Sequence, residues 1–166
     1  IYRNYNPLGA LYLDAECEKE GFQSPNAVIL GHSLRIGGAI TCFGNIQNYS
    51  DKTFASEHAK VLIQTPEKKM RYTVRFANIV KGWEPTKRTA FAGESDFRSW
   101  YDSSRESAAM VLDTDSEPNQ VISLVSCSYN FWKQNERTVV TTSIDQKQAL
   151  TETVSTESRQ TGSDAE

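Results

Sequence analysis

Residues 121–127 read VISLVSC and residues 135–144 read NERTVVTTSI, and these two apolar stretches decide the fold of the chain. Both are rich in the branched side chains that favour β-strands. Side chains alternate between the two faces of a strand, so only one face of the second stretch can look at Cys127. The pair predicts neighbouring strands that place the Cys127 thiol and the Arg137 guanidinium at facing ends.

A cysteine beside a permanent cation is suited to nucleophilic chemistry. The thiolate is the reactive form of cysteine, and a nearby cation or imidazolium lowers the pKa of the thiol. His32 ends another apolar stretch, residues 27–32 (AVILGH). Cys127, His32 and Arg137 therefore form a candidate site for attack on an amide. The loop between the two strands, residues 128–136, is expected to form the wall of a groove.

Each of these three residues also has a structural interpretation. A lone cysteine at the end of a buried strand is more often a small inert hydrophobe than a nucleophile. A lone histidine at a strand end is usually structural, and an arginine on a strand is usually solvated or ion-paired. The combination of residue type, order and strand context favours the catalytic interpretation.

The motifs resemble those of the sortase family, which are cysteine transpeptidases of Gram-positive bacteria, over about residues 9–144. The family motif Thr-Leu-x-Thr-Cys matches Ser123-Leu124-Val125-Ser126-Cys127, with serine at both threonine positions. The Gly-His motif of the family matches Gly31-His32, and the arginine of its following strand matches Arg137.

The resemblance is strongest to class B sortases. Three features carry it: GALYLD at residues 9–14, Gly37-Gly38 after the histidine, and the helical stretch DFRSWYDSSRESA at residues 96–108. Two features depart from the class. Its Gly-His-Asn-Met reads Gly31-His32-Ser33-Leu34 here, and the segment AITCFGNI at residues 39–46 is longer than usual.

The resemblance implies a mainly β fold, a closed β-barrel of the sortase type with peripheral helices. Residues 1–144 would form the catalytic domain. Class B sortases begin with a helical segment and two strands ahead of the strand that matches residues 9–14, so we expect N-terminal strands to be missing from this chain. Residues 145–166 have no aromatic side chain and are dominated by Thr, Ser, Glu and Gln, which predicts a disordered polar tail.

Hydrophobic periodicity predicts the individual elements. Helices are expected where apolar residues recur every three to four positions, with Ser50 and Ser95 as N-caps of two of them. Strands are expected at residues 9–14, 27–32, 58–65, 70–80, 121–126 and 137–144, and helices at residues 38–49, 50–59 and 93–111.

The implied reaction cleaves a C-terminal sorting motif after its Thr. Cys127 would form a thioester with the Thr carbonyl, and an amine of a peptidoglycan precursor or a pilin would resolve it. His32 would protonate the leaving amine and deprotonate the incoming one. Arg137 would stabilise the oxyanion.

Substrate binding is expected at three residues beside the nucleophile. Tyr129 and Trp132 are predicted to wall the groove. Ser126 is also a candidate for substrate contact, although alternation points it to the opposite face, where its hydroxyl would serve only the backbone.

Two other functions remain open. A class C-like pilin polymerase would use the same three catalytic residues. A sortase-like barrel that only binds peptides is the alternative from a different class, either because the expected truncation disables it or because the serine substitutions weaken the site. Reaction with a thiol-specific electrophile distinguishes a nucleophile from an inert thiol.

Composition narrows the partners and the location. The net charge of −3 over 166 residues gives no basic stripe, which argues against nucleic acid as a partner. No apolar run approaches the roughly 18 residues of a membrane span, so membrane attachment is expected only through a missing N-terminal anchor. The resemblance implies the extracellular face of the bacterial plasma membrane. We expect no cofactor and no metal.

The chain has three cysteines, an odd number that leaves at least one thiol unpaired. Cys127 is expected to be the free one. A bridge between Cys17 and Cys42 is possible, but two unbridged cysteines are favoured.

Overall fold

The computed structural model describes residues 9–17, 21–36, 39–65, 69–82, 87–112, 117–131 and 135–144. The strands are β1 (Tyr12–Leu13), β2 (Asn26–Leu30), β3 (Arg35–Ile36), β4 (Ala39–Ile40), β5 (Lys60–Gln64), β6 (Lys69–Lys81), β7 (Met110–Val111), β8 (Val121–Ser128) and β9 (Glu136–Ser143). The helices are the two 3-10 turns η1 (Gly21–Gln23) and η2 (Ile46–Ser50), and the α-helices α1 (Lys52–Glu57) and α2 (Glu94–Glu106).

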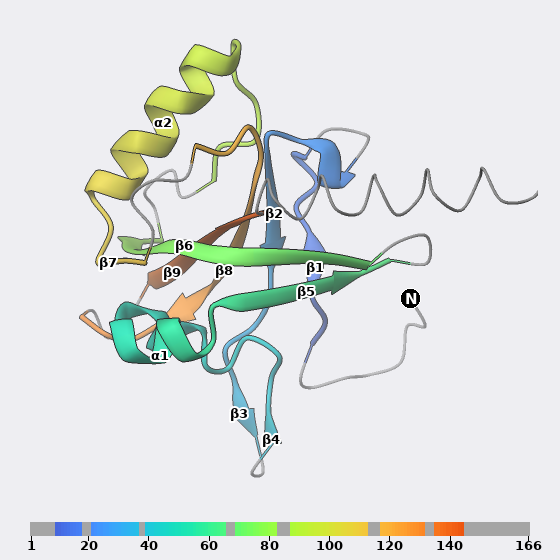
Figure 1. Ribbon diagram of the computed structural model, residues 1–166. Coiled ribbons are helices and arrows are strands. Elements are labelled where there is room, and N and C mark those ends of the chain that lie inside the picture. The colour runs from blue at the N-terminus through green and yellow to red at the C-terminus, as the bar shows by residue number, and fades with distance from the viewer. Residues whose placement is uncertain are drawn as a thin grey trace, which may run out of the picture.

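The sheet confirms the prediction of a mainly β chain. Its hydrogen-bonded order is β1-β2-β8-β9-β6-β5, with β7 beside β6 (Figure 1). Strands β2 and β8 run parallel, and the other pairs in this sheet are antiparallel. The path leads from β1 to β5, and within the described residues no pairing joins these two ends. The predicted neighbours at residues 9–14 and 27–32 pair as β1 and β2.

The sheet buries residues on both faces. Figure 1 shows α1 and α2 on opposite sides of it. Alternation along β8 sends Leu124 to the side of η2 and α1, where it joins Phe43 and Ile46 in the largest core cluster. The other face carries a cluster around Val125 and Val139. A third cluster unites strand and α2 residues, namely Phe76, Phe97, Tyr101 and Val121.

Three predictions about helices are wrong in detail. The segment at residues 38–49 is not an α-helix, because strand β4 is followed by successive three-residue turns whose backbone bonds run from Gly44 to Thr41 and from Ile46 to Phe43. Such turns reproduce a three-residue apolar spacing without an α-helix.

The predicted caps are replaced by neighbouring residues. Asp51, rather than Ser50, caps α1, because its carboxylate accepts the Phe54 N–H at 2.8 Å. Helix α2 begins one residue before Ser95, and Gly93 occupies the cap position without a side-chain bond. The Asp96 carboxylate accepts the Ala92 N–H at 2.9 Å instead.

Two further predictions concern the C-terminal tail and membrane-spanning segments. The predicted disordered tail, residues 145–166, lies outside the described residues. In the described ranges, no helix is both long enough and apolar enough to span a bilayer.

We predict that one leucine truncation lowers the stability of the fold strongly and that another leaves it almost unchanged. Leu124→Ala should lower the free energy of unfolding by about 2–5 kcal/mol, because a core side chain that is 7% exposed would leave a cavity. Leu62→Ala should change it by less than about 0.5 kcal/mol, because Leu62 is 75% exposed on β5. Urea denaturation of both variants measures the difference, and equal losses would contradict the assigned core.

Candidate active site

Cys127 and Arg137 are cross-strand partners. Strands β8 and β9 pair in a register that sets the two residues directly opposite each other. Residues in direct opposition place their side chains on the same face, with β-carbons about 5 Å apart. The thiol is free and half-buried, and Arg137 is likewise half-buried. The predicted strand pairing is confirmed, and it brings a thiol beside a guanidinium.

The register of β2 and β8 leads the chain toward His32 and Cys127 at the same end of the two strands. Parallel pairing of β2 with β8 ends at Leu30 opposite Val125, and His32 and Cys127 follow two residues later on their own chains. The Gly31 N–H continues this contact by donating to the Val125 carbonyl at 3.2 Å. The register thus draws together the ends of three strands.

Ser126 supports the contact between the ends of β2 and β8 from the face of the sheet opposite Cys127. Its hydroxyl donates to the Gly31 carbonyl at 2.7 Å, and the residue is only 3% exposed. This bond ties strand β8 to the residue before His32. The hydroxyl thus serves the backbone, which was one of the two interpretations of this serine.

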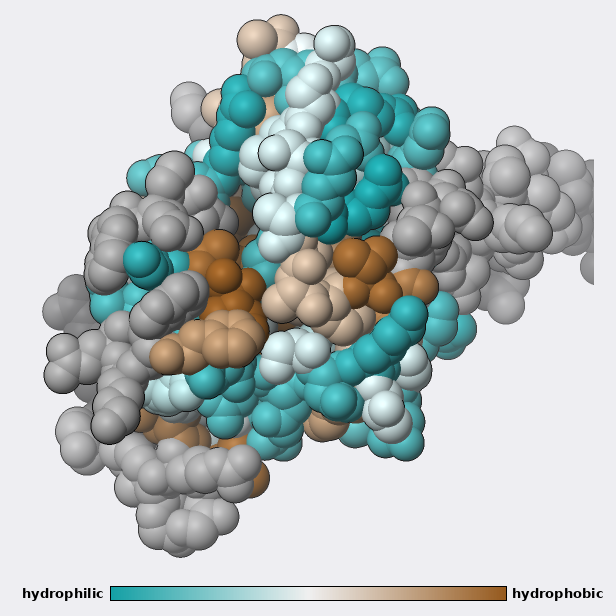
Figure 2. Space-filling view, turned by 90° about the vertical axis from the view of Figure 1, so that its left-hand side faces the viewer, coloured by the Kyte–Doolittle hydropathy of each residue, from teal (hydrophilic) through white to brown (hydrophobic). Residues whose placement is uncertain are grey.

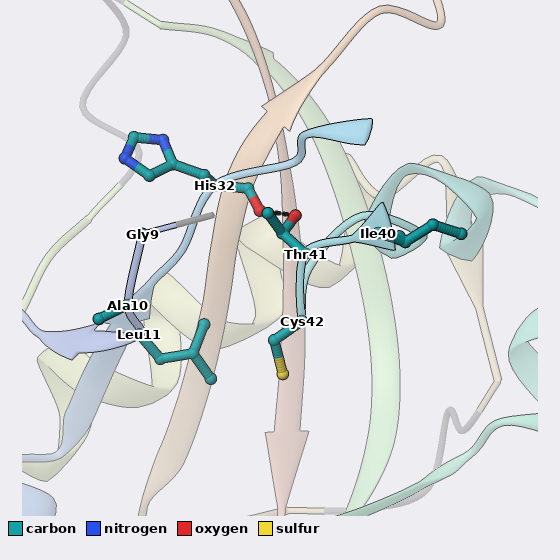
Figure 3. Close-up of a pocket in the computed structure, with 7 residues that line it drawn as sticks. All are labelled: Gly9, Ala10, Leu11, His32, Ile40, Thr41 and Cys42. Atoms are coloured by element: carbon teal, nitrogen blue, oxygen red, sulfur yellow. Dashed lines mark hydrogen bonds between the residues drawn. The ribbon is translucent and has the colours of Figure 1, made fainter. Parts of the chain in front are cut away.

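The His32 ring lines a pocket of about 230 Å³. Figure 3 shows the ring on the side of Gly9 and turned away from Cys42. A β-carbon on Gly9 would lie 2.7 Å from His32 Cδ2, so glycine is needed for this close approach, and its φ of 72° also favours glycine. Cys127 does not line this pocket. The residues that line the pocket are Gly9, Ala10, Leu11, His32, Ile40, Thr41 and Cys42.

Thr41 holds the segment that carries His32, and no sequence motif indicates this role. Its hydroxyl donates to the His32 carbonyl and accepts the Leu34 N–H at 2.9 Å. The side chain is 7% exposed. Because the apolar spacing predicts a helix here, a threonine that bridges two ends of a hairpin could not be recognised.

The aromatic residues that follow Cys127 face solvent. Tyr129 is 59% exposed and Phe131 is 69% exposed. Trp132, the other predicted groove residue, lies outside the described residues. Figure 2 shows apolar residues gathered at the level of the sheet, with more polar surface above them where α2 lies.

Glu136 is a second residue that the sequence did not single out. It is 0% exposed, and its carboxylate accepts three hydrogen bonds from the segment after Cys127. An acidic residue before an arginine is ordinarily a surface ion pair. Only the register, which points Glu136 away from Cys127 and into the protein, distinguishes it.

Asp14 and Lys87 form an ion pair that shifts the pKa of both groups. Burial raises the pKa of Asp14, but hydrogen bonds from Lys87 and from the Glu16 N–H outweigh burial and lower it overall. The ammonium of Lys87 lies 2.6 Å from Asp14, and this bond raises the pKa of the lysine. The pair anchors the chain after β1. Among the described residues, no group of three His, Cys, Asp or Glu could hold a metal ion.

Comparison with known proteins identifies the family. The family model for the sortase domain matches residues 3–145. Among curated proteins, no sequence shows significant similarity to the chain.

Solved structures share the fold. Sortase B from the type II pilus of Streptococcus pneumoniae has a TM-score of 0.69 and 22% identity, over 82% of this chain and 76% of that one. Staphylococcus aureus sortase B, solved as a substrate complex, has a TM-score of 0.71 and 19% identity, over 86% of this chain and 65% of that one. A sortase B complexed with triglycine has a TM-score of 0.70 and 19% identity, over 86% of this chain and 65% of that one.

The chain thus spans a little less than two thirds of the length of these last two structures. The predicted sortase-type fold is confirmed by all three. Because the family model covers most of the sequence, the chain belongs to the sortase family of cysteine transpeptidases, and its fold resembles that of class B sortases.

Proposed function

We propose that this chain cleaves a C-terminal sorting motif after Thr and joins the new carboxyl end to an amine, with Cys127 as nucleophile. The observation that carries the proposal is the direct opposition of Cys127 and Arg137 on β8 and β9. A guanidinium facing a thiol stabilises the thiolate and, later, the oxyanion of an acyl intermediate. Residues 1–144 are proposed to form the catalytic domain.

The first half-reaction forms a thioester. The Cys127 sulfur attacks the Thr carbonyl carbon, an oxyanion develops, and the carbon–nitrogen bond breaks as the leaving amine takes a proton from His32. In the second half-reaction, an amine attacks the thioester and gives its proton to His32, and the Cys127 thiolate leaves. Atoms and charge balance over the two steps, and the product is a new amide.

Arg137 is proposed to stabilise the oxyanion. A guanidinium has five N–H donors, and the bond from Nη1 to the Glu136 carbonyl at 2.9 Å uses one of them. That bond also directs the guanidinium along the end of β9. Its planar fork is suited to a developing oxyanion beside Cys127.

The proposed reaction requires the His32 imidazole to reach the Cys127 thiol. The ring lines the pocket beside Gly9, and Cys127 does not line that pocket. The side chain is exposed, and rotamer changes of exposed side chains take picoseconds to nanoseconds. Rotation about the side-chain bonds of His32 would bring the imidazole toward the thiol without moving the strands.

The proposed partners follow from the relatives. One sortase B is solved with its substrate, another with triglycine, and a third belongs to a type II pilus. They support a sorting-signal peptide as the donor and an amine of a peptidoglycan precursor or a pilin as the acceptor. Sortases are associated with the cell surface, and for this chain we propose the extracellular face of the plasma membrane, reached through an N-terminal anchor.

A second candidate function is peptide binding without turnover. The observation that favours it is the His32 ring, which lines a pocket that Cys127 does not share. Mass spectrometry after incubation with a panel of sorting peptides separates the two. A thioester adduct on Cys127 supports the transpeptidase, and peptide binding without an adduct supports the alternative.

Cys127→Ala should abolish peptide cleavage and leave the fold intact, because a small half-buried side chain is replaced by another and only the nucleophile is lost. Chromatography of a cleaved fluorescent peptide measures the turnover, and circular dichroism checks the fold. Persistent cleavage by the folded variant would reject Cys127.

His32→Ala should lower kcat by about a hundredfold or more, because both half-reactions lose their proton carrier. His58→Ala is the matched control. His58 ends α1, stacks on Phe54 with ring centroids 4.1 Å apart, and does not line the pocket that His32 lines. Its loss should leave kcat unchanged, and equal losses at the two histidines would refute the assignment.

Arg137→Lys should lose nearly as much activity as Arg137→Ala. An ammonium keeps the charge but cannot reproduce the planar fork of donors. Single-turnover rates of both variants compare the two. Substantial rescue by lysine would show that the arginine acts only through its charge.

A further inference from the structure

A buried carboxylate organises the chain that leaves the nucleophile. Glu136 Oε1 accepts from the Ser128 hydroxyl at 2.7 Å and from the Asn130 N–H at 2.6 Å. Oε2 accepts from the Phe131 N–H at 2.7 Å. Burying an ionised carboxylate is costly unless hydrogen bonds compensate it, and three donors converge on this one.

The carboxylate takes over where the strand ladder stops. Ser128 and Glu136 form the last rung between β8 and β9, and the neighbouring rung is Cys127 opposite Arg137. Beyond the rung of Ser128 and Glu136, Asn130 and Phe131 have no residue of β9 opposite them. The two oxygens of Glu136 accept their N–H groups instead, so one side chain extends the pairing beyond the reacting pair.

Other contacts hold the same turn at its margins. Asn135 adopts a φ of 58°, and its carbonyl accepts the Gly82 N–H at 2.6 Å, which fixes the start of β9 against the end of β6. The Asn130 side chain donates to the Gln47 carbonyl of η2 at 3.2 Å. Glu136 is the member of this set that accepts hydrogen bonds from the segment after Cys127 and directly precedes Arg137 in the chain.

We propose that Glu136 is a positioning residue for the transpeptidase site, which acts by holding the Cys127–Arg137 rung in register through Ser128 and the turn that follows. The inference rests on the proposed function of Cys127. It also means that the backbone N–H groups of Asn130 and Phe131, beside the exposed Tyr129, are held by the same carboxylate.

Glutamine cannot replace this carboxylate. It has the same shape, but one of its two terminal atoms is an NH₂ group that donates and cannot accept. In Glu136→Gln, an amide N–H of the turn would face another donor. The buried donor left unsatisfied should open the turn and loosen the adjacent rung.

The test compares three variants at a temperature well below unfolding. Glu136→Gln removes the clamp, and Ser128→Ala removes one of its bonds. Ser123→Ala is the matched control, since Ser123 is also a buried serine of β8 and donates to a side-chain oxygen on the neighbouring strand, that of Asn26 at 2.8 Å, but several residues before Cys127. Rates are expressed per Cys127 thiol titrated.

We expect Glu136→Gln to lower kcat by about tenfold or more, Ser128→Ala to lower it severalfold, and Ser123→Ala to leave it within about twofold of the original, with the peptide KM changed less than kcat throughout. Wild-type kcat in Glu136→Gln would overturn the proposal. So would an equal loss in Ser123→Ala and Ser128→Ala, because the effect would then be general destabilisation.

A second measurement keeps the test independent of the proposed function. Hydrogen exchange at the Asn130 and Phe131 amides should accelerate by about tenfold or more in Glu136→Gln but not in Ser123→Ala. Alkylation of Cys127 by iodoacetamide, mapped against the exposed Cys42, should slow in the same variant. If the wild-type chain processes no sorting peptide, the proposed function fails, and these two readouts still decide whether Glu136 positions the thiol.

Discussion

The register of β8 between β2 and β9 is the constraint on which the rest of the site depends. A shift of one residue would send every side chain of β8 to the opposite face of the sheet. Cys127 would then face the core, and Ser126 would face Arg137. Buried side chains on both faces of β8 oppose such a shift, since its pattern from Val121 to Ser126 is continuously buried. The apolar core thereby specifies the chemistry at the strand end.

Polar bonds then refine what the core establishes. Ser126 joins β8 to the Gly31 carbonyl, Thr41 joins the two sides of the hairpin after His32, and Glu136 closes the turn after Ser128. Each bond involves a proposed catalytic residue or a residue next to one. Hydrogen bonds at such positions contribute only about 1 kcal/mol each to folding. Their larger effect is on alignment, to which acyl transfer is sensitive.

Much of the strand arrangement could be predicted from the sequence, and the features that were missed have a physical explanation. The strands around Cys127 and Arg137 are predictable because alternation and β-branched residues are local signals. Glu136 and Thr41 were missed because their partners are set by tertiary register, which no local pattern contains. The helix expected at residues 38–49 failed because consecutive tight turns give nearly the same apolar spacing as a helix. The catalytic roles rest on the family resemblance and stay predictions.

The parallel pairing of β2 with β8 has a consequence for how the protein becomes active. The bond from Ser126 to Gly31 joins residues 95 positions apart in the chain. Contacts of this separation require a large loop to close, and chains dominated by them fold slowly. Until β8 has been synthesised and inserted beside β2, His32 and Cys127 belong to unconnected parts of the polypeptide. A partly synthesised chain therefore has the Cys42 thiol and the His32 imidazole but lacks the paired strands β2 and β8 that bring His32 and Cys127 toward each other.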